Sequence, residues 1–371
     1  MRTYIFIALI FPVFGMVLNP GFYTFTAFIF ILVATSPYFL LIGDKGYFVN
    51  DIKALSSFIF ITVLALGFSN LGWIAISAGY EPSILLSTEG LGLVAAESVV
   101  IRYQDGQSNS GNPVILAFSL WLIFRLSLGG VKHSRYKIGL AFLPLIGYTI
   151  LTTEKFALLL GLAFYAVGAL SFGSFRDNLS TIWKSSWYSL LLVPILLLSM
   201  LMRGHESSDF SAFLYQLLSY VFFQYYGLGF WLVEKYNDAQ LMFGSLTFAG
   251  PLSALDIVER KSGIYSYSYS IKGLQSNIYT AYRNISEDFS IYFPFIFNLF
   301  ISILYLHFHA YRFKSGLVLL KIFLLFFVVL SFTTTPFVYN SVVLAIVLCL
   351  LNVQFQMKNI SRIKGEMISP T

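Results

Sequence analysis

A cluster of charged and titratable side chains follows directly after a hydrophobic segment. The stretch Arg203-Gly204-His205-Glu206-Ser207-Ser208-Asp209 brings together a guanidinium, an imidazole and two carboxylates. Arginine binds phosphate oxygens through two parallel hydrogen bonds, and its charge is permanent. His205, Glu206 or Asp209 could take a proton from an attacking hydroxyl group. The alternative interpretation is that these residues only begin a solvated loop.

Further cations lie in segments that connect apolar stretches. Lys155 and Glu154 stand in the short turn Thr152–Lys155, Arg260 lies within a later polar segment, and Arg102 lies in an earlier one. Each cation could face a phosphate group. The alternative for Lys155 is that it anchors a helix end by extending its ammonium group toward water.

A run of alternating tyrosines and serines, Tyr265-Ser266-Tyr267-Ser268-Tyr269-Ser270, has a period of two residues. This period predicts an extended segment with Tyr265, Tyr267 and Tyr269 on one face. Tyrosine rings pack against the C–H faces of sugars, and phenolic hydroxyls bond to sugar hydroxyls. The alternative is a belt of aromatic side chains at a membrane interface.

The composition identifies the environment in which these groups must work. Charged residues make up 11% of the 371 residues, and hydrophobic residues make up 57%. Soluble domains carry about 25% charged residues, so an ordinary soluble protein is excluded. Cys349 is the only cysteine, which excludes an intramolecular disulfide and a cysteine-based zinc site. The sequence predicts an all-α integral membrane protein.

Apolar segments close to the length of a bilayer crossing recur along the chain. We predict about ten transmembrane helices, at Tyr4–Leu18, Phe22–Ile42, Ala54–Ile76, Pro113–Leu128, Ile138–Leu151, Phe156–Phe175, Trp187–Met202, Phe289–Phe308, Leu317–Phe332 and Val338–Val353. Asn19-Pro20-Gly21 follows the first segment in place of a signal-peptide cleavage site.

The distribution of basic residues predicts the orientation. With the N-terminus inside, the short inner loops and the helix ends near them hold most of the basic residues, and the only acidic residues there are Asp44, Asp51, Asp177 and Glu366. Basic residues concentrate on the cytoplasmic side of membrane proteins. Both termini are therefore expected to be cytoplasmic.

Two long segments are expected on the outer side, residues 77–112 and 203–288. The second contains a further apolar stretch, residues 210–231. If this stretch crossed the membrane fully, every later basic loop would lie outside. We therefore interpret it as re-entrant or interfacial, with Gly227 and Gly229 near its turn.

The segment that leads into the eighth predicted helix resembles a motif of a known protein family. Asn277-Ile278-Tyr279-Thr280, then Arg283 and then Asp288-Phe289 resemble segments of the Wzy-type O-antigen polymerases, which polymerise oligosaccharide repeat units in Gram-negative inner membranes. That family commonly has Asn-Val/Ile-Tyr-Thr, a following Arg, and Asp-Phe-Gly at a helix entry. Ser290 stands here in place of the usual Gly.

Two shorter segments are also similar to the family. Glu154-Lys155 resembles its short polar turn, with Lys in place of Arg, and Arg203-Gly204 resembles the arginine that opens its large periplasmic loop. The resemblance in helix number and loop layout covers most of the chain.

The resemblance implies a reaction at the periplasmic face of the bacterial inner membrane. A growing chain on undecaprenyl diphosphate would be transferred to the non-reducing sugar of a new lipid-linked repeat unit. This step needs cations at the diphosphate, and Arg203, Arg260, Arg283 and Lys155 are the candidates, with Arg102 as a fifth. It also needs a base for the attacking hydroxyl, for which Glu206, Asp288 and His205 are the candidates. Asn277 and Tyr279 are expected to join the tyrosines in binding sugar.

No cofactor or metal is expected, because neither long outer segment contains an Asp-x-Asp motif. The expected partners are the lipid-linked oligosaccharide, the bilayer and a separate chain-length regulator, with no nucleic acid. Two alternatives remain open: an O-antigen ligase, which transfers finished polymer to lipid A-core, and a lipid-linked oligosaccharide flippase or transporter. Charged residues deep within the helices, expected of a flippase, are almost absent.

Overall fold

The computed structural model describes residues 2–41, 54–104, 111–128, 135–154, 156–172, 180, 222–258, 269–271, 274–276, 280–311, 314–331 and 335–366. Within these residues the chain is helical apart from turns, loops and one short hairpin, in which β1 (Tyr269–Ile271) pairs antiparallel with β2 (Leu274–Ser276). Tyr269 and Ser270 lie in β1, which confirms the extended conformation at this end of the tyrosine run; residues 265–268 lie outside the described part of the chain.

The described helices include apolar ones long enough to cross a bilayer. Helical segments at Phe22–Leu41, Ser57–Ser77, Phe293–Ala310 and Asn340–Lys358 meet this criterion of length and composition. Shorter apolar helices lie at Tyr4–Leu18, Pro113–Ser127, Tyr136–Thr152, Phe156–Leu170 and Ser315–Leu330. A described helix therefore overlaps each predicted span except 187–202, which lies outside the described residues. The four longer helices are therefore candidate membrane spans.

The chain divides into two compact units. The first comprises residues 1–45 and 207–343, and the second comprises residues 46–206 and 344–371.

In the second unit, α3 (Ser57–Ser77), α5 (Pro113–Ser127), α6 (Arg135–Thr152) and α7 (Phe156–Leu170) pack against one another. The 3₁₀ helix η2 (Pro82–Leu86) and α4 (Thr88–Gln104) fill most of the expected outer segment 77–112. The Asn112 N–H donates to the side-chain oxygen of Asn70 over 2.7 Å, which ties the start of α5 to α3.

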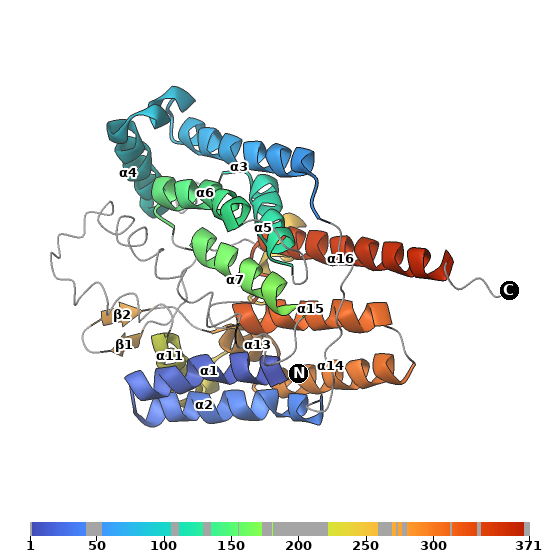
Figure 1. Cartoon of the computed structure of the whole chain (residues 1–371). Helices are drawn as coiled ribbons and strands as arrows, with labels where there is room; N and C mark the ends of the chain where they lie inside the picture. Colours follow the sequence, from blue (N-terminus) through green and yellow to red (C-terminus); the bar gives the residue numbers. More distant parts are fainter. Residues whose placement is uncertain are drawn as a thin grey trace. The chain divides into compact units, whose positions relative to one another are not determined.

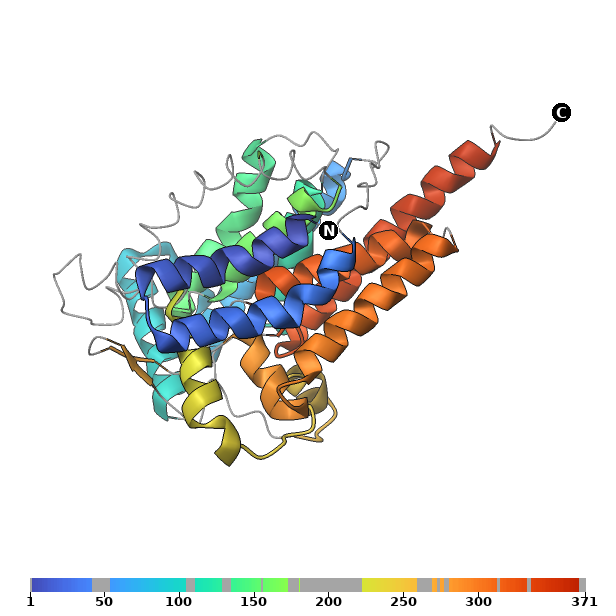
Figure 2. The same ribbon diagram turned by 90° about the horizontal axis from the view of Figure 1, so that it is seen from below.

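The first unit is built around a helical pair at the N-terminus. Helices α1 (Arg2–Leu18) and α2 (Phe22–Thr35) lie side by side, as Figures 1 and 2 show, and α2 continues into the 3₁₀ helix η1 (Ser36–Leu41). Helix α14 (Phe293–Ala310) packs against α2 and η1, and α15 (Lys314–Leu330) packs against α1 and α14. The last helix, α16 (Asn340–Glu366), begins in this unit.

Helix α11 (Gln224–Glu234) also packs closely against α2. At Gly229 an added Cβ would lie 1.8 Å from the backbone oxygen of Tyr23, so only glycine permits this approach of the two backbones. The prediction of a turn near Gly227 and Gly229 is therefore wrong, because both residues lie inside α11. Residues 210–221 of the predicted re-entrant stretch lie outside the described residues.

The eighth predicted span begins later than expected. Its first residue, Phe289, instead ends a separate short helix, α13 (Ala281–Phe289), and α14 starts at Phe293. The break falls at Ser290, whose φ of 103° lies in the region that favours glycine. A non-helical residue at this position ends α13, and Pro294 then occupies the first turn of α14.

Candidate functional site

Helix α13 carries the site, and backbone hydrogen bonds from distant segments position it. The Ala281 N–H donates to the Ser331 oxygen at the end of α15 over 2.9 Å. At the other end of the helix, the Met242 N–H donates to the Glu287 oxygen over 3.2 Å, and the Phe243 N–H donates to the Asp288 oxygen over 3.1 Å. Residues 281 to 288 are all buried, so α13 is surrounded by protein.

A buried ion pair joins two turns of α13. Arg283 Nη2 lies 3.0 Å from Glu287 Oε2, and these side chains are 1% and 10% exposed. Their spacing of four residues places them on the same face of the helix. Arg283 Cζ also lies 5.7 Å from the ring centroid of Trp231 in α11, which is a cation–π contact.

The surroundings of Glu287 adjust its proton affinity. Burial raises the pKa of the Glu287 carboxyl, the Arg283 charge and hydrogen bond lower it, and the neighbouring Asp288 raises it, with a net increase. A carboxylate with a raised pKa is a stronger base than an exposed glutamate. Groups of this kind are candidates for proton transfer.

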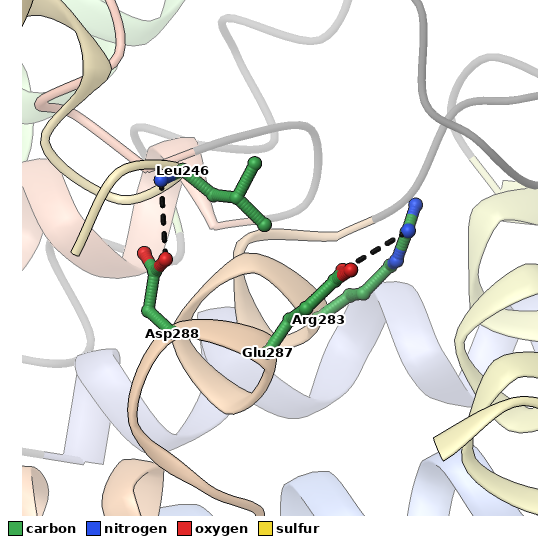
Figure 3. A network of polar contacts seen from close by, with 4 residues as sticks. All are labelled: Leu246, Arg283, Glu287 and Asp288. Atoms are coloured by element: carbon green, nitrogen blue, oxygen red, sulfur yellow. Dashed lines mark hydrogen bonds and ion pairs between the residues drawn. The ribbon is translucent and has the colours of Figure 1, made fainter. Parts of the chain in front are cut away.

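Asp288 points in a different direction, as Figure 3 shows. Its Oδ1 accepts the Leu246 N–H over 3.1 Å, and its Oδ2 accepts the Thr247 N–H. Burial raises the pKa of the Asp288 carboxyl, while hydrogen bonds from Thr247, Leu246 and Gly244 lower it in part. Because both oxygens accept backbone hydrogen bonds, Asp288 is suited to holding the 244–247 turn against α13. The same turn is held by Thr335, whose hydroxyl donates to the Thr247 oxygen over 2.7 Å.

A pocket of about 270 Å³ lies beside the Glu287 side of α13. It is lined by Tyr236, Asn237, Ala239, Leu241, Ser286, Glu287 and Ser290. The Ser286 side chain is fully buried, and its hydroxyl has no hydrogen-bond partner among the described residues. The pocket therefore combines a carboxylate, hydroxyls, an amide and one aromatic ring.

Of the residues predicted for the site, the structure brings Arg283 and Asp288 together on α13. Arg102 lies in α4 and Tyr269 in β1, where the backbone alone is described. The other predicted residues lie outside the described part of the chain: Lys155, Arg203, His205, Glu206, Arg260, Tyr265, Tyr267, Asn277 and Tyr279. Their roles stay predictions.

Sequence reasoning did not select Glu287, Ser286 or the segment 236–241 for the site. The spacing of Arg283 and Glu287 was the signal for the first of these, because opposite charges four residues apart pair on a helix. No local sequence pattern could have indicated the pocket, because the residues of its two walls are distant in the sequence. Within the described ranges, no group of three or more His, Cys, Asp and Glu side chains is placed to hold a metal ion.

The chain matches no family model, and no curated protein or solved structure is significantly similar to it.

Proposed function

We propose that this chain is a membrane glycosyltransferase that polymerises oligosaccharide repeat units linked to undecaprenyl diphosphate. The observation that carries the proposal is the buried Arg283–Glu287 pair beside a polar pocket, on a short helix that leads into the apolar helix α14. A lipid-linked sugar could place its polar head group in a site beside the start of an apolar helix while its lipid stays in the bilayer. The resemblance of residues 277–289 to O-antigen polymerases supports the same function.

The reaction requires a base and positive charge at one place. A sugar hydroxyl attacks the anomeric carbon of the donor, and the bond from that carbon to the diphosphate oxygen breaks with its electron pair on the leaving group. A carboxylate that accepts the hydroxyl proton assists the attack. Cations stabilise the charge that develops on the diphosphate. Among the described candidates, Arg283 supplies positive charge beside the carboxylate. The roles of Arg203, Arg260 and Lys155 stay predictions from the sequence.

We place this reaction at the periplasmic face of the bacterial inner membrane, with both termini in the cytoplasm. A test of orientation uses the Cys349→Ser protein with a single new cysteine at Leu86, which is 92% exposed in η2. A membrane-impermeant maleimide added to spheroplasts should label Leu86→Cys without permeabilisation. A Lys358→Cys protein should be labelled only after permeabilisation, and the opposite pattern would invert the proposed orientation.

The function is tested by the lipopolysaccharide of cells that lack this chain. We expect core that carries a single repeat unit, with the polymer ladder lost, because the unit is made, exported and ligated without being polymerised. Complementation with the wild-type chain, or with Arg312→Ala on the predicted cytoplasmic side, should restore the ladder. Arg283→Ala should fail to restore it while still inserting into the membrane.

Other outcomes of the same gel would contradict the proposal. Bare core together with accumulated lipid-linked polymer would identify a ligase. Bare core without such polymer would favour a flippase.

A further inference from the structure

The pocket beside α13 has the size of a subsite for one sugar ring. Its volume of about 270 Å³ lies just below the range of about 300–1,000 Å³ in which drug-sized ligands bind. Its walls come from two separate parts of the chain. One side is formed by Tyr236, Asn237, Ala239 and Leu241, and the other by Ser286, Glu287 and Ser290.

The polar groups of this pocket match a ligand rich in hydroxyls. The buried Ser286 hydroxyl has no hydrogen-bond partner among the described residues, and a bound hydroxyl would supply one. The amide of the exposed Asn237 can both donate and accept hydrogen bonds. Glu287 can accept from a further hydroxyl. Each polar group can therefore bond to the same class of ligand.

An aromatic ring gives the pocket an apolar surface for the C–H face of a sugar. The half-buried Tyr236 lines the pocket, and its ring contacts Trp231 edge-to-face, with the centroids 5.5 Å apart. Trp231 is fully buried and also faces the Arg283 guanidinium. This one indole therefore supports both the sugar-facing ring and the cation that pairs with Glu287.

The charge of the pocket lining indicates which part of a lipid-linked saccharide the pocket can bind, the sugar or the diphosphate. Among the described residues, the lining contains one carboxylate, Glu287, and no basic side chain. A diphosphate group would find no basic side chain in this described lining, because the nearby Arg283 guanidinium is paired with Glu287, whereas a neutral sugar needs no such cation. The pocket therefore suits the neutral sugar that accepts the growing chain.

We propose that this pocket binds the terminal sugar of the acceptor repeat unit, with Glu287 as the base for its attacking hydroxyl. This inference rests on the proposed polymerase function. The acceptor oxygen forms a bond to the anomeric carbon of the donor as its proton passes to Glu287. The bond to the diphosphate breaks at the same centre, and the electron pair leaves with the diphosphate. Ser286, Asn237 and Tyr236 hold the acceptor ring, and Arg283 positions the Glu287 carboxylate.

The experiment uses the purified full-length chain in detergent with two glycolipids extracted from cells. The acceptor probe is the undecaprenyl-diphosphate-linked repeat unit that accumulates in cells lacking this chain. The donor probe is lipid-linked polymer from cells lacking a ligase. Each glycolipid is titrated at a fixed concentration of the other, and chain extension is followed on gels. This design gives separate KM values for acceptor and donor.

Ser286→Ala and Asn237→Ala should each raise the acceptor KM about fivefold, the value of one hydrogen bond, and leave the donor KM unchanged. Glu287→Gln should lower kcat by about 10²–10⁴-fold with the acceptor KM little changed, which is the loss expected for a general base. Glu287→Asp, which keeps the carboxylate, should retain part of kcat. Ser253→Ala, a serine of α12 (Ala249–Ala254) outside the pocket, is the matched control and should leave both KM values unchanged.

The possible failures are distinguishable. An active wild-type chain with unchanged kinetics in Ser286→Ala and Glu287→Gln would overturn the acceptor subsite and leave the polymerase function standing. Changes confined to the donor KM would also overturn it, since the pocket would then bind the donor. A wild-type chain that extends neither probe, together with a normal ladder in cells lacking the chain, would refute the polymerase function itself. Melting temperatures of all variants identify any that fail to fold.

Discussion

Replacement of the buried ion pair by apolar side chains should separate its structural role from its chemical role. Arg283 and Glu287 are 3.0 Å apart, with 1% and 10% of their side chains exposed. We consider Arg283→Met, Glu287→Met and the double variant, because methionine approximates the length of both side chains and adapts to irregular spaces.

The expected magnitude follows from the distance and the burial. Two unit charges 3.0 Å apart attract by about 5–6 kcal/mol at an effective dielectric constant of about 20. Removal of each charge from water costs several kcal/mol, so the pair as a whole contributes little net stability. Removal of one partner leaves the other buried and unpaired, which should cost about 3–5 kcal/mol. The double variant should therefore lie within about 1–2 kcal/mol of wild type, far from the sum of the single variants.

The assay measures unfolding in mixed micelles with increasing SDS, beside polymer synthesis in complemented cells. The double variant should be nearly as stable as wild type, because it retains the packing. Under the proposed function it should produce no ladder, because it lacks the proposed base and the proposed cation. Additive destabilisation in the double variant would show that the two side chains do not interact as the structure has them. A stable double variant that makes normal polymer would remove both residues from the reaction.

Three further outcomes are expected. Gly229→Ala should destabilise the protein by more than about 3 kcal/mol, because its Cβ would lie 1.8 Å from the Tyr23 oxygen. Gly92→Ala, whose Cβ meets no atom within 4 Å, should be neutral or stabilising by up to about 1 kcal/mol. Thermal unfolding in detergent compares the two variants, and equal effects would contradict the contact between α11 and α2. Ser290→Gly should raise the melting temperature, because glycine adopts the φ of 103° without the strain of about 1–3 kcal/mol expected for serine. An unchanged or lower melting temperature would argue against that backbone conformation. The rate of polymerisation in vitro should fall as the pH drops through the raised pKa of Glu287, since protonation removes the proposed base. The fall in rate should therefore occur at a pH above about 4.3, the pKa of an ordinary glutamate. A rate that stays constant down to that pH would exclude Glu287 as the base.

The sequence was informative wherever one local property decided the structure. Long apolar segments such as 54–76 predicted helices because a helix satisfies its own backbone hydrogen bonds without water, and α3 (Ser57–Ser77) lies there. The motif before the eighth span selected Arg283 and Asp288, and both are buried on α13. Ser290 stands where the resembling segments have Gly, which left the start of the eighth predicted helix open, and the structure has a break between two helices at this residue.

Features that depend on contacts between distant segments were not predicted. Gly229 was assigned to a turn because glycine is common in turns, whereas its function in α11 is to admit the backbone of Tyr23. Asp288 was a candidate base from the sequence alone. The sequence does not disclose that the backbone N–H groups of Leu246 and Thr247 donate to its two carboxylate oxygens. The pocket joins residues 236–241 to α13, and no local pattern indicates that pairing.

The attachment of α13 to Ser331 also has a consequence for biogenesis. The ribosome delivers residues 281–289 to the membrane more than forty residues before Ser331, whose carbonyl accepts the Ala281 N–H. The 244–247 turn, which Asp288 holds, is in turn fixed by Thr335, which is made later still. The hydrogen bonds that hold α13 and the 244–247 turn can therefore be complete only after residues 331 and 335 have been synthesised. A chain truncated before Ser331 would carry these charged residues without the hydrogen bond from Ala281 and without the Thr335 contact to the 244–247 turn.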